Sequence, residues 1–238
     1  MQTTKIIHSA VILSSLLCAG FFLVLFHSIR FEPDDMITSG QLNNNSLIDL
    51  LINKYYSTSF RPLFIVTSFF TIGYKTIDVT YYFTTVFVYF VAVYLLFVFS
   101  MYKLLKEIFS LAVSGVKEKL LLLGFANLLF TCLYFLATEK IEIFGWYCCS
   151  TIYLWPVSIT CFSAWILVKR SQRKTDFILL FTCALLIAGG AEHVPASVIA
   201  GITVIITLLF FEKGKDKSFF VENKGFIRKT IFFTSVLT

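Results

Sequence analysis

Long apolar runs separated by short polar segments dominate the chain. An α-helix rises about 1.5 Å per residue, so roughly 20 residues cross a hydrocarbon layer of about 30 Å. Runs of about that length predict transmembrane helices. The convincing runs are Ile6–Phe26, Val79–Tyr102, Leu120–Ala137, Ile152–Val168, Phe177–Ala191 and Val194–Phe211.

Composition supports lipid as the solvent of this chain. Apolar residues make up 58% of the sequence and charged residues 14%, and the mean hydropathy is +0.83. Soluble domains are nearer half apolar and a quarter charged. The net charge of +6 does not indicate a nucleic-acid partner, because the basic residues stand between apolar runs rather than in one patch.

Two further apolar segments are too short to span a membrane. Pro62–Ile72 would cover only ~17 Å as a helix, and the run that opens at Ile231 only ~12 Å. We predict an all-α, polytopic helical membrane protein with about seven transmembrane helices and a truncated eighth. Residues 1–238 would form a single transmembrane domain, which we expect to be the N-terminal part of a longer one.

The basic residues predict the orientation, because cytoplasmic loops are enriched in Lys and Arg. If Pro62–Ile72 does not cross, one side of the membrane holds 15 of the 20 basic residues. These lie at Lys5, Lys103–Lys119, Lys169–Lys174 and Lys213–Lys229. We therefore predict a multi-pass protein of the cell inner or plasma membrane with a cytoplasmic N-terminus. Pro62–Ile72 would be an interfacial helix in a long first extracytoplasmic loop, about Ser28–Asp78.

The opposite side collects eight of the 14 acidic residues. They are Glu32, Asp34, Asp35, Asp49, Asp78, Glu139, Glu142 and Glu192. Three of them crowd into Phe31–Met36, just after the first span. Adjacent carboxylates near a membrane repel each other, so they indicate a bound cation, a hydrogen-bonding network or a proton-transfer task. The alternative is a solvated turn in which Pro33 and the Asp pair begin the next helix.

This acidic pair, placed in a long outer loop before an interfacial helix and many spans, resembles the GT-C superfamily of membrane glycosyltransferases. Members carry an Asp-Asp or Asp-Glu motif in the first extracytoplasmic loop, and the matching residues here are Asp34 and Asp35. In bacterial members the loop often continues to an aromatic-Gly-Arg or similar tripeptide. The segment Ser59–Pro62 is similar but lacks the Gly. The resemblance covers about all of this chain and the N-terminal half of a typical member.

The resemblance implies transfer of a sugar from a polyprenyl-phosphate donor to an acceptor on the outer face. Asp34 or Asp35 would be the catalytic base on the acceptor hydroxyl, while its neighbour binds donor phosphate through a cation or fixes the loop. Arg61 and Arg30 would bind phosphate, because the guanidinium fork matches phosphate oxygens. No cofactor is firmly implied, and a divalent metal ion at the Asp pair is left open.

Two other positions are candidate substrate contacts. The adjacent residues Glu192 and His193 separate two apolar runs, and the first run is short, so they would line a cavity below the outer surface or form a polar hairpin tip. Trp155 follows the second outer loop, about Thr138–Thr151. It would stack on a sugar or, the reading we favour, belong to the interfacial aromatic belt.

The leading prediction is thus a GT-C-type enzyme of cell-envelope glycan assembly, with the lipid bilayer and a polyprenyl-phosphate-linked sugar as partners. The alternatives are a non-enzymatic transporter or flippase and a polysaccharide polymerase. Transporters favour charges at the membrane midplane. The runs Val79–Tyr102, Leu120–Ala137 and Ile152–Val168 contain no Asp, Glu, Lys, Arg or His, which favours an enzyme acting at the outer face. No oligomeric state is predicted.

Overall fold

The computed structural model is built from helices, and the predicted all-α class is confirmed for the part of the chain that it describes. The described residues are 2–27, 46, 48–49, 52, 79–108, 116–136, 147–169, 171–188, 195–203 and 224–237. The helices are α1 (Gln2–His27), α5 (Val79–Ile108), α6 (Val116–Leu136), α8 (Tyr147–Val168), α9 (Lys174–Ala188) and α12 (Lys224–Leu237). Residues 195–203 are also helical.

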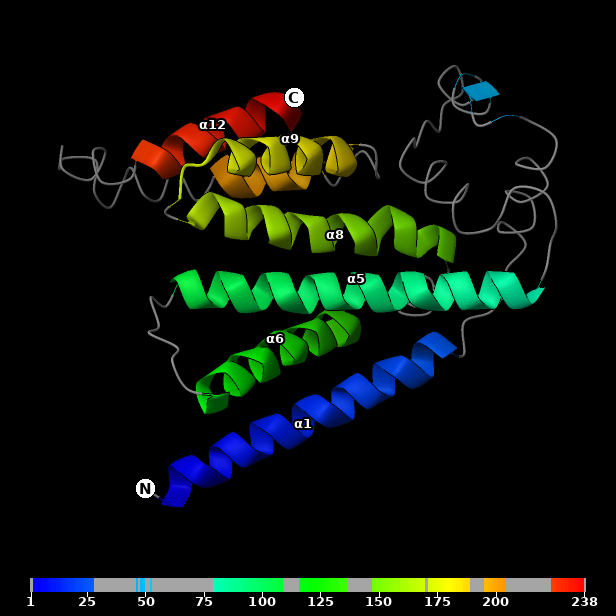
Figure 1. The fold of residues 1–238 in the computed structure, drawn as a ribbon, viewed down its shortest axis with the longest axis vertical. Helices are drawn as coiled ribbons and strands as arrows, with labels where there is room; N and C mark the ends of the chain where they lie inside the picture. Colours follow the sequence, from blue (N-terminus) through cyan, green and yellow to red (C-terminus); the bar gives the residue numbers. More distant parts are fainter. Residues whose placement is uncertain are drawn as a thin grey trace.

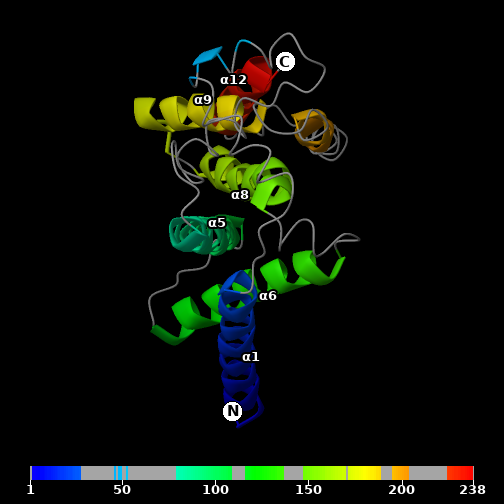
Figure 2. The ribbon, with the colours of Figure 1, turned by 90° about the vertical axis from the view of Figure 1, so that its right-hand side faces the viewer.

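The helices form a stack with α5 at its centre (Figure 1). On one side α5 contacts α6 and α1, and on the other it contacts α8. Beyond α8 lie α9 and α12, which pack against each other and against α8. The turned view shows the same succession, with α1 and α12 at opposite ends (Figure 2). Two apolar cores therefore form, one on each side of the α5–α8 contact.

Aromatic rings fill the core between α1, α5 and α6. Phe22 is fully buried, and its ring meets that of Phe130 edge-on at 4.7 Å between centroids. Phe26 stacks on Phe90 at 5.1 Å, and Tyr94 meets Phe130 at 5.0 Å. Such edge-to-face and tilted pairs contribute about 0.5–1.5 kcal/mol beyond the burial of their area. The Phe-rich sequence is thus used in part for ring packing inside the structure.

A small residue and a polar residue bring α1 and α6 together. A Cβ atom at Gly124 would lie 2.8 Å from Val11 Cγ1, so only glycine allows this close approach. One turn further, Asn127 donates to the backbone oxygen of Ser15 and to its hydroxyl at 3.0 Å, and accepts from Tyr94 Oη. Small residues and interhelical hydrogen bonds of this kind hold helices together in lipid.

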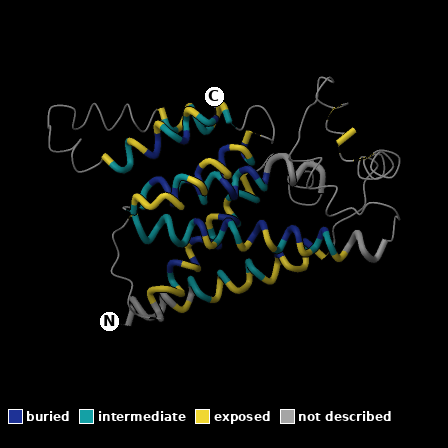
Figure 3. Tube along the Cα trace, turned by 45° about the horizontal axis from the view of Figure 1, so that its top comes forward, coloured by how far each residue is buried: buried dark blue, intermediate teal, exposed yellow. Residues whose placement is uncertain are grey.

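Among the described residues, two helical stretches are long and apolar enough to cross a membrane, Thr84–Ile108 and Glu118–Leu136. They match two of the predicted spans. Less than half of the most apolar part of each stretch is buried inside the structure, whereas the core helix of a soluble protein is mostly buried. Val11–His27 and Leu154–Val168 are apolar but shorter among the described residues. Figure 3 shows exposed positions recurring along these helices. The larger number of spans stays a prediction.

The helices extend beyond the apolar runs. The run Val79–Tyr102 predicts an end at Tyr102, but α5 continues to Ile108, and α12 begins at Lys224 rather than at Ile231. The first turns of α6 and α8 likewise precede their runs. Hydropathy marks where side chains stop being apolar, whereas Lys, Glu and Leu favour helix on both sides of that point. Basic stretches that we assigned to loops are therefore partly helical.

Candidate functional site

Most of the predicted outer-face site lies outside the described residues. This applies to the acidic pair, to both arginines and to the hairpin tip: Asp34, Asp35, Arg30, Arg61, Glu192 and His193. Trp155 is the one predicted site residue that the structure describes. The predicted outer-face cavity and its chemistry therefore stay predictions.

Trp155 lies in the interface between α5 and α8. Its ring centroid is 6.2 Å from that of Tyr89, and it packs against both apolar cores. The indole Nε1 is buried and meets no hydrogen-bond acceptor among the described residues. Pro156, the next residue, stands inside α8. Trp155 thus contributes to the packing of α8 on α5, which is a role that neither sequence interpretation included.

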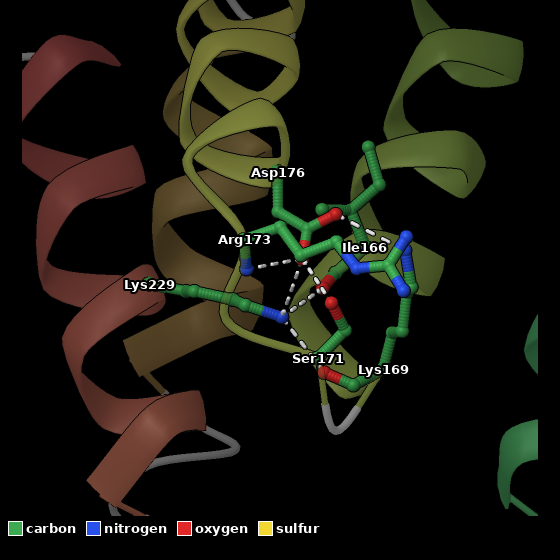
Figure 4. Close-up of polar contacts among 6 residues, drawn as sticks. All are labelled: Ile166, Lys169, Ser171, Arg173, Asp176 and Lys229. Atoms are coloured by element: carbon green, nitrogen blue, oxygen red, sulfur yellow. Dashed lines mark hydrogen bonds and ion pairs between the residues drawn. The ribbon is translucent and has the colours of Figure 1, made fainter.

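The described part of the chain contains a cluster of charges that we call the polar junction, formed by the buried residues Asp176 and Lys229 and the partly exposed Lys169 (Figure 4). Asp176 and Lys229 are essentially inaccessible to solvent, at 2% and 0% exposure. Lys169 Nζ lies 3.1 Å from Asp176 Oδ1, and Lys229 Nζ lies 3.9 Å from Asp176 Oδ2. Ser171 Oγ also donates to Asp176 Oδ2, at 3.0 Å. Three helices, α8, α9 and α12, meet at this cluster.

The junction forms where the C-terminal end of α8 meets the N-terminal end of α9. Lys229 Nζ donates to the carbonyl oxygens of Ile166 at 2.8 Å and of Lys169 at 2.7 Å. These are carbonyls of the last turn, which an α-helix leaves without intrahelical partners. Asp176 accepts from the backbone N–H of Arg173 at 3.2 Å, as the acidic member of a capping box does. Each charge thus lies at the helix end whose dipole favours it.

The two buried groups have shifted pKa values. Burial acts to raise the pKa of the Asp176 carboxyl, but the hydrogen bonds from Lys169 and Ser171, the charge of Lys169 and the Arg173 N–H together hold it below 3.8. Burial lowers the pKa of the Lys229 ammonium from 10.5, and the nearby Asp176 charge opposes that shift. Asp176 is therefore a carboxylate at neutral pH.

The polar junction is suited to holding helices together rather than to catalysis. Lys229 is fully buried and uses its ammonium on two carbonyls and one carboxylate. Sequence reasoning missed this cluster because it counted the basic segments only as cytoplasmic loops. One signal was present: Asp176 is the single acid between Ser171 and the apolar run, at the third helical position, where a capping side chain is expected.

Neither metal ligands among the described residues nor similarity to known proteins identifies a function. In the described part of the chain, no group of three or more His, Cys, Asp and Glu side chains is placed to hold a metal ion. No family model matches the chain, and neither a curated protein nor a solved structure is significantly similar to it. Evidence for a function therefore comes from the residues of this chain alone.

Proposed function

We propose that this chain is a polytopic membrane protein that carries out sugar transfer at the extracytoplasmic face. The membrane part is supported by large apolar side chains on the outer faces of the helices. Leu136 is 82% exposed and Val24 67%. Water would disfavour such surfaces by about 25 cal/mol per Å², whereas lipid accommodates them. The helices α1, α5, α6 and α9 all carry such side chains, among them Leu17, Val88, Phe135 and Ile178.

The positions of the basic residues support the proposed orientation. The positive-inside argument requires Lys103, Lys169 and Lys229 to lie on one side of the membrane, although long stretches of sequence separate them. In the structure, Lys103 and Lys169 both lie within 6 Å of the Trp165 ring centroid, and Lys169 and Lys229 share Asp176. This common end would face the cytoplasm.

Cysteine labelling tests the orientation. In a variant without the native cysteines, a membrane-impermeant thiol reagent added from outside should label single cysteines placed at Asn44, Glu139 or His193. It should not label cysteines at Gly115, Ser171 or Gly214. Labelling at Ser171 from outside would overturn the predicted orientation. Each crossing determines the side of the next loop, so one misplaced loop changes the sides of the others.

The glycosyltransferase part of the proposal is carried by the acidic pair Asp34-Asp35, which follows closely after the end of α1 at His27. In this position the pair would lie at the outer surface, where a lipid-linked sugar presents its phosphate. Asp34 or Asp35 would accept the proton of the attacking hydroxyl, and Arg61 would stabilise the departing phosphate. The sugar is the electrophile and the polyprenyl phosphate the leaving group. This is the chemistry of the GT-C superfamily, which the loop resembles.

The buried polar groups of the described helices favour an enzyme over a transporter. A transport pathway needs polar groups that face an open path at the midplane. Asn127 instead binds Ser15 and Tyr94, so these side chains join α1, α5 and α6 to one another. A polysaccharide polymerase would share the outer-face chemistry, and it remains an alternative that assay products distinguish.

A transfer assay tests the function directly. The purified protein in lipid is incubated with a panel of polyprenyl-phosphate sugars, and released polyprenyl phosphate and transferred sugar are measured. We expect turnover of at least one donor, with one sugar added per acceptor. Products that lengthen with time would indicate a polymerase. If no donor in the panel is consumed while a labelled donor moves between leaflets, the flippase alternative is correct.

A further inference from the structure

The cytoplasmic ends of α5 and α8 carry a basic and aromatic cluster that the proposed sugar transfer does not use. Lys103 Nζ lies 5.9 Å from the ring centroid of Trp165, and Lys169 Nζ lies 5.6 Å from the same centroid. Phe99 packs edge-on against Trp165 at 5.8 Å. Lys103 also lies over the Phe99 ring at 5.4 Å. Two ammonium groups from two helices therefore converge on one indole.

The charges at this cluster are incompletely balanced. Lys169 is paired with Asp176, whereas Lys103 forms no ion pair within the described residues. Glu107, the nearest acid along α5, likewise has no ion pair there with Lys103. Two ammonium groups beside one ring repel each other, and an anion that lies between them offsets this repulsion. The cluster is thus complementary to a group with negative charge and several acceptor oxygens.

An apolar stripe leads along α5 to this cluster. Val88 is 58% exposed, Leu95 57% and Phe99 44%. Their spacing of seven and four residues puts them on one helix face, and Lys103 continues that face by one further turn. From Val88 to Phe99 the stripe is ~16 Å long, about half of a ~30 Å hydrocarbon layer. One leaflet's acyl chain would lie along this stripe and bring its phosphate to Lys103.

We propose that Lys103 and Lys169, beside Trp165, form a binding site for the phosphate of an anionic phospholipid in the cytoplasmic leaflet. The proposal rests on the membrane insertion proposed above but not on sugar transfer. Lys103 supplies a charge that has no ion-pair partner in the described part of the chain, and Trp165 supplies an indole at the headgroup level, where Trp is favoured. The apolar stripe on α5 binds an acyl chain. Anionic lipid is the occupant that matches both the charge and the stripe.

Fluorescence quenching tests this site. In a variant with Trp146→Phe and Trp155→Phe, Trp165 is the only remaining tryptophan. The protein is placed in phosphatidylcholine vesicles that contain a small fraction of lipid brominated near the headgroup. Brominated phosphatidylglycerol should quench Trp165 more strongly than brominated phosphatidylcholine. One Lys near an anionic lipid corresponds to about fivefold in binding, so Lys103→Gln should reduce the preference about fivefold and Lys103→Arg should retain it.

Matched controls separate the outcomes. Lys119→Gln removes the same charge on the same side of the membrane, at an exposed position on α6, and should leave the preference unchanged. Equal effects of Lys119→Gln and Lys103→Gln would show a diffuse surface attraction and overturn the site. If excess inorganic phosphate abolishes the preference for phosphatidylglycerol, the site binds a soluble anion and the lipid proposal is overturned. Quenching by neither lipid would overturn the membrane insertion itself, whereas equal quenching by both would overturn only the lipid site.

Native mass spectrometry on the unmodified protein provides a second measurement that does not need the tryptophan substitutions. Phosphatidylglycerol should remain bound to the wild-type chain and to the Lys119→Gln variant after the detergent has been removed. It should be reduced about fivefold on Lys103→Gln. Equal retention on all three proteins would also overturn the site.

Discussion

Lys229 Nζ donates a 2.8 Å hydrogen bond to the carbonyl oxygen of Ile166, and this contact attaches α12 to the last turn of α8. The same ammonium group lies near Asp176 on α9. One side chain thus joins three helices, and it donates to carbonyl oxygens at the end of α8 that the helix itself leaves without intrahelical partners. Removing this side chain should lower the free energy of unfolding more than removing an exposed lysine.

Lys229→Met keeps the length of the side chain and removes its charge. We expect this change to lower the free energy of unfolding by about 1–3 kcal/mol, because two carbonyls lose their donor while Asp176 keeps Lys169. Lys224→Met, at the exposed start of the same helix, should change it by less than about 0.5 kcal/mol. The measurement is unfolding by SDS in mixed micelles. Equal effects of the two variants would contradict a structural role for the polar junction.

Acid should weaken the polar junction through Asp176. Its folded-state pKa lies below the ordinary 3.8, so the unfolded state binds the proton more readily. The stabilisation is therefore complete above about pH 5 and is lost as the pH falls through the lowered folded-state pKa. The free energy of unfolding of the wild type should decline with acid, while that of Asp176→Asn declines less. An equal decline in the wild type and in Asp176→Asn would contradict a role of the Asp176 carboxylate in the acid dependence.

The hydrogen bond between Tyr94 and Asn127 should be visible as an energetic coupling. Asn127→Leu and Tyr94→Phe each remove one partner. In a double-mutant cycle we expect a coupling of about 0.6 kcal/mol and no more than about 1.7, as for hydrogen bonds between membrane helices. Additive losses would show that the two groups do not interact in the folded protein.

Gly124 and Gly20 form a matched pair of helical glycines. Gly124→Ala should destabilise by about 1–3 kcal/mol, because the new methyl group meets Val11, whose β-branched side chain has little freedom to move. A methyl group added at Gly20 would meet nothing within 4 Å, so Gly20→Ala should be neutral or stabilise by up to about 1 kcal/mol. Val11→Ala should recover much of the loss in the Gly124→Ala protein. Destabilisation by both glycine changes alike would argue against the close contact.

Activity should depend on the acidic pair if the chain transfers sugar. Asp34→Asn and Asp35→Asn keep the shape of the side chains, and loss of a general base commonly lowers rates by about 10²–10⁴. At least one of the two should lose activity, while membrane insertion is unchanged. Arg61→Lys should mainly weaken donor binding. Asp49→Asn is the control in the same predicted loop, and wild-type rates in both Asp variants would remove the main support for the enzyme.

The apolar runs predicted most of the described helices because a long apolar run is a property of local composition. The runs Val79–Tyr102 and Leu120–Ala137 became α5 and α6 with longer ends, since helix propensity continues where hydropathy stops. The burial of Lys229 could not be predicted in this way. It depends on the end of α8 lying beside α12, and no local pattern encodes that contact. The position of Trp155 could not be predicted for the same reason. The sequence places it near the membrane surface, whereas the structure packs it between α5 and α8.

The bond between Asn127 and Ser15 joins residues that are 112 positions apart in the chain. A ribosome adds about 5–20 residues per second, so Asn127 is synthesised roughly 6–22 s after Ser15. For most of that time neither α5 nor α6, the two helices that contact α1, has been completed. The helix α1 must therefore remain stable without them. In the proposed membrane, lipid would accommodate its apolar surface during this time. The contact of Phe22 with Phe130 and that of the Ser15 carbonyl with Asn127 form only after α6 has been synthesised. The rate of translation therefore sets the earliest time at which α1 and α6 can pack together.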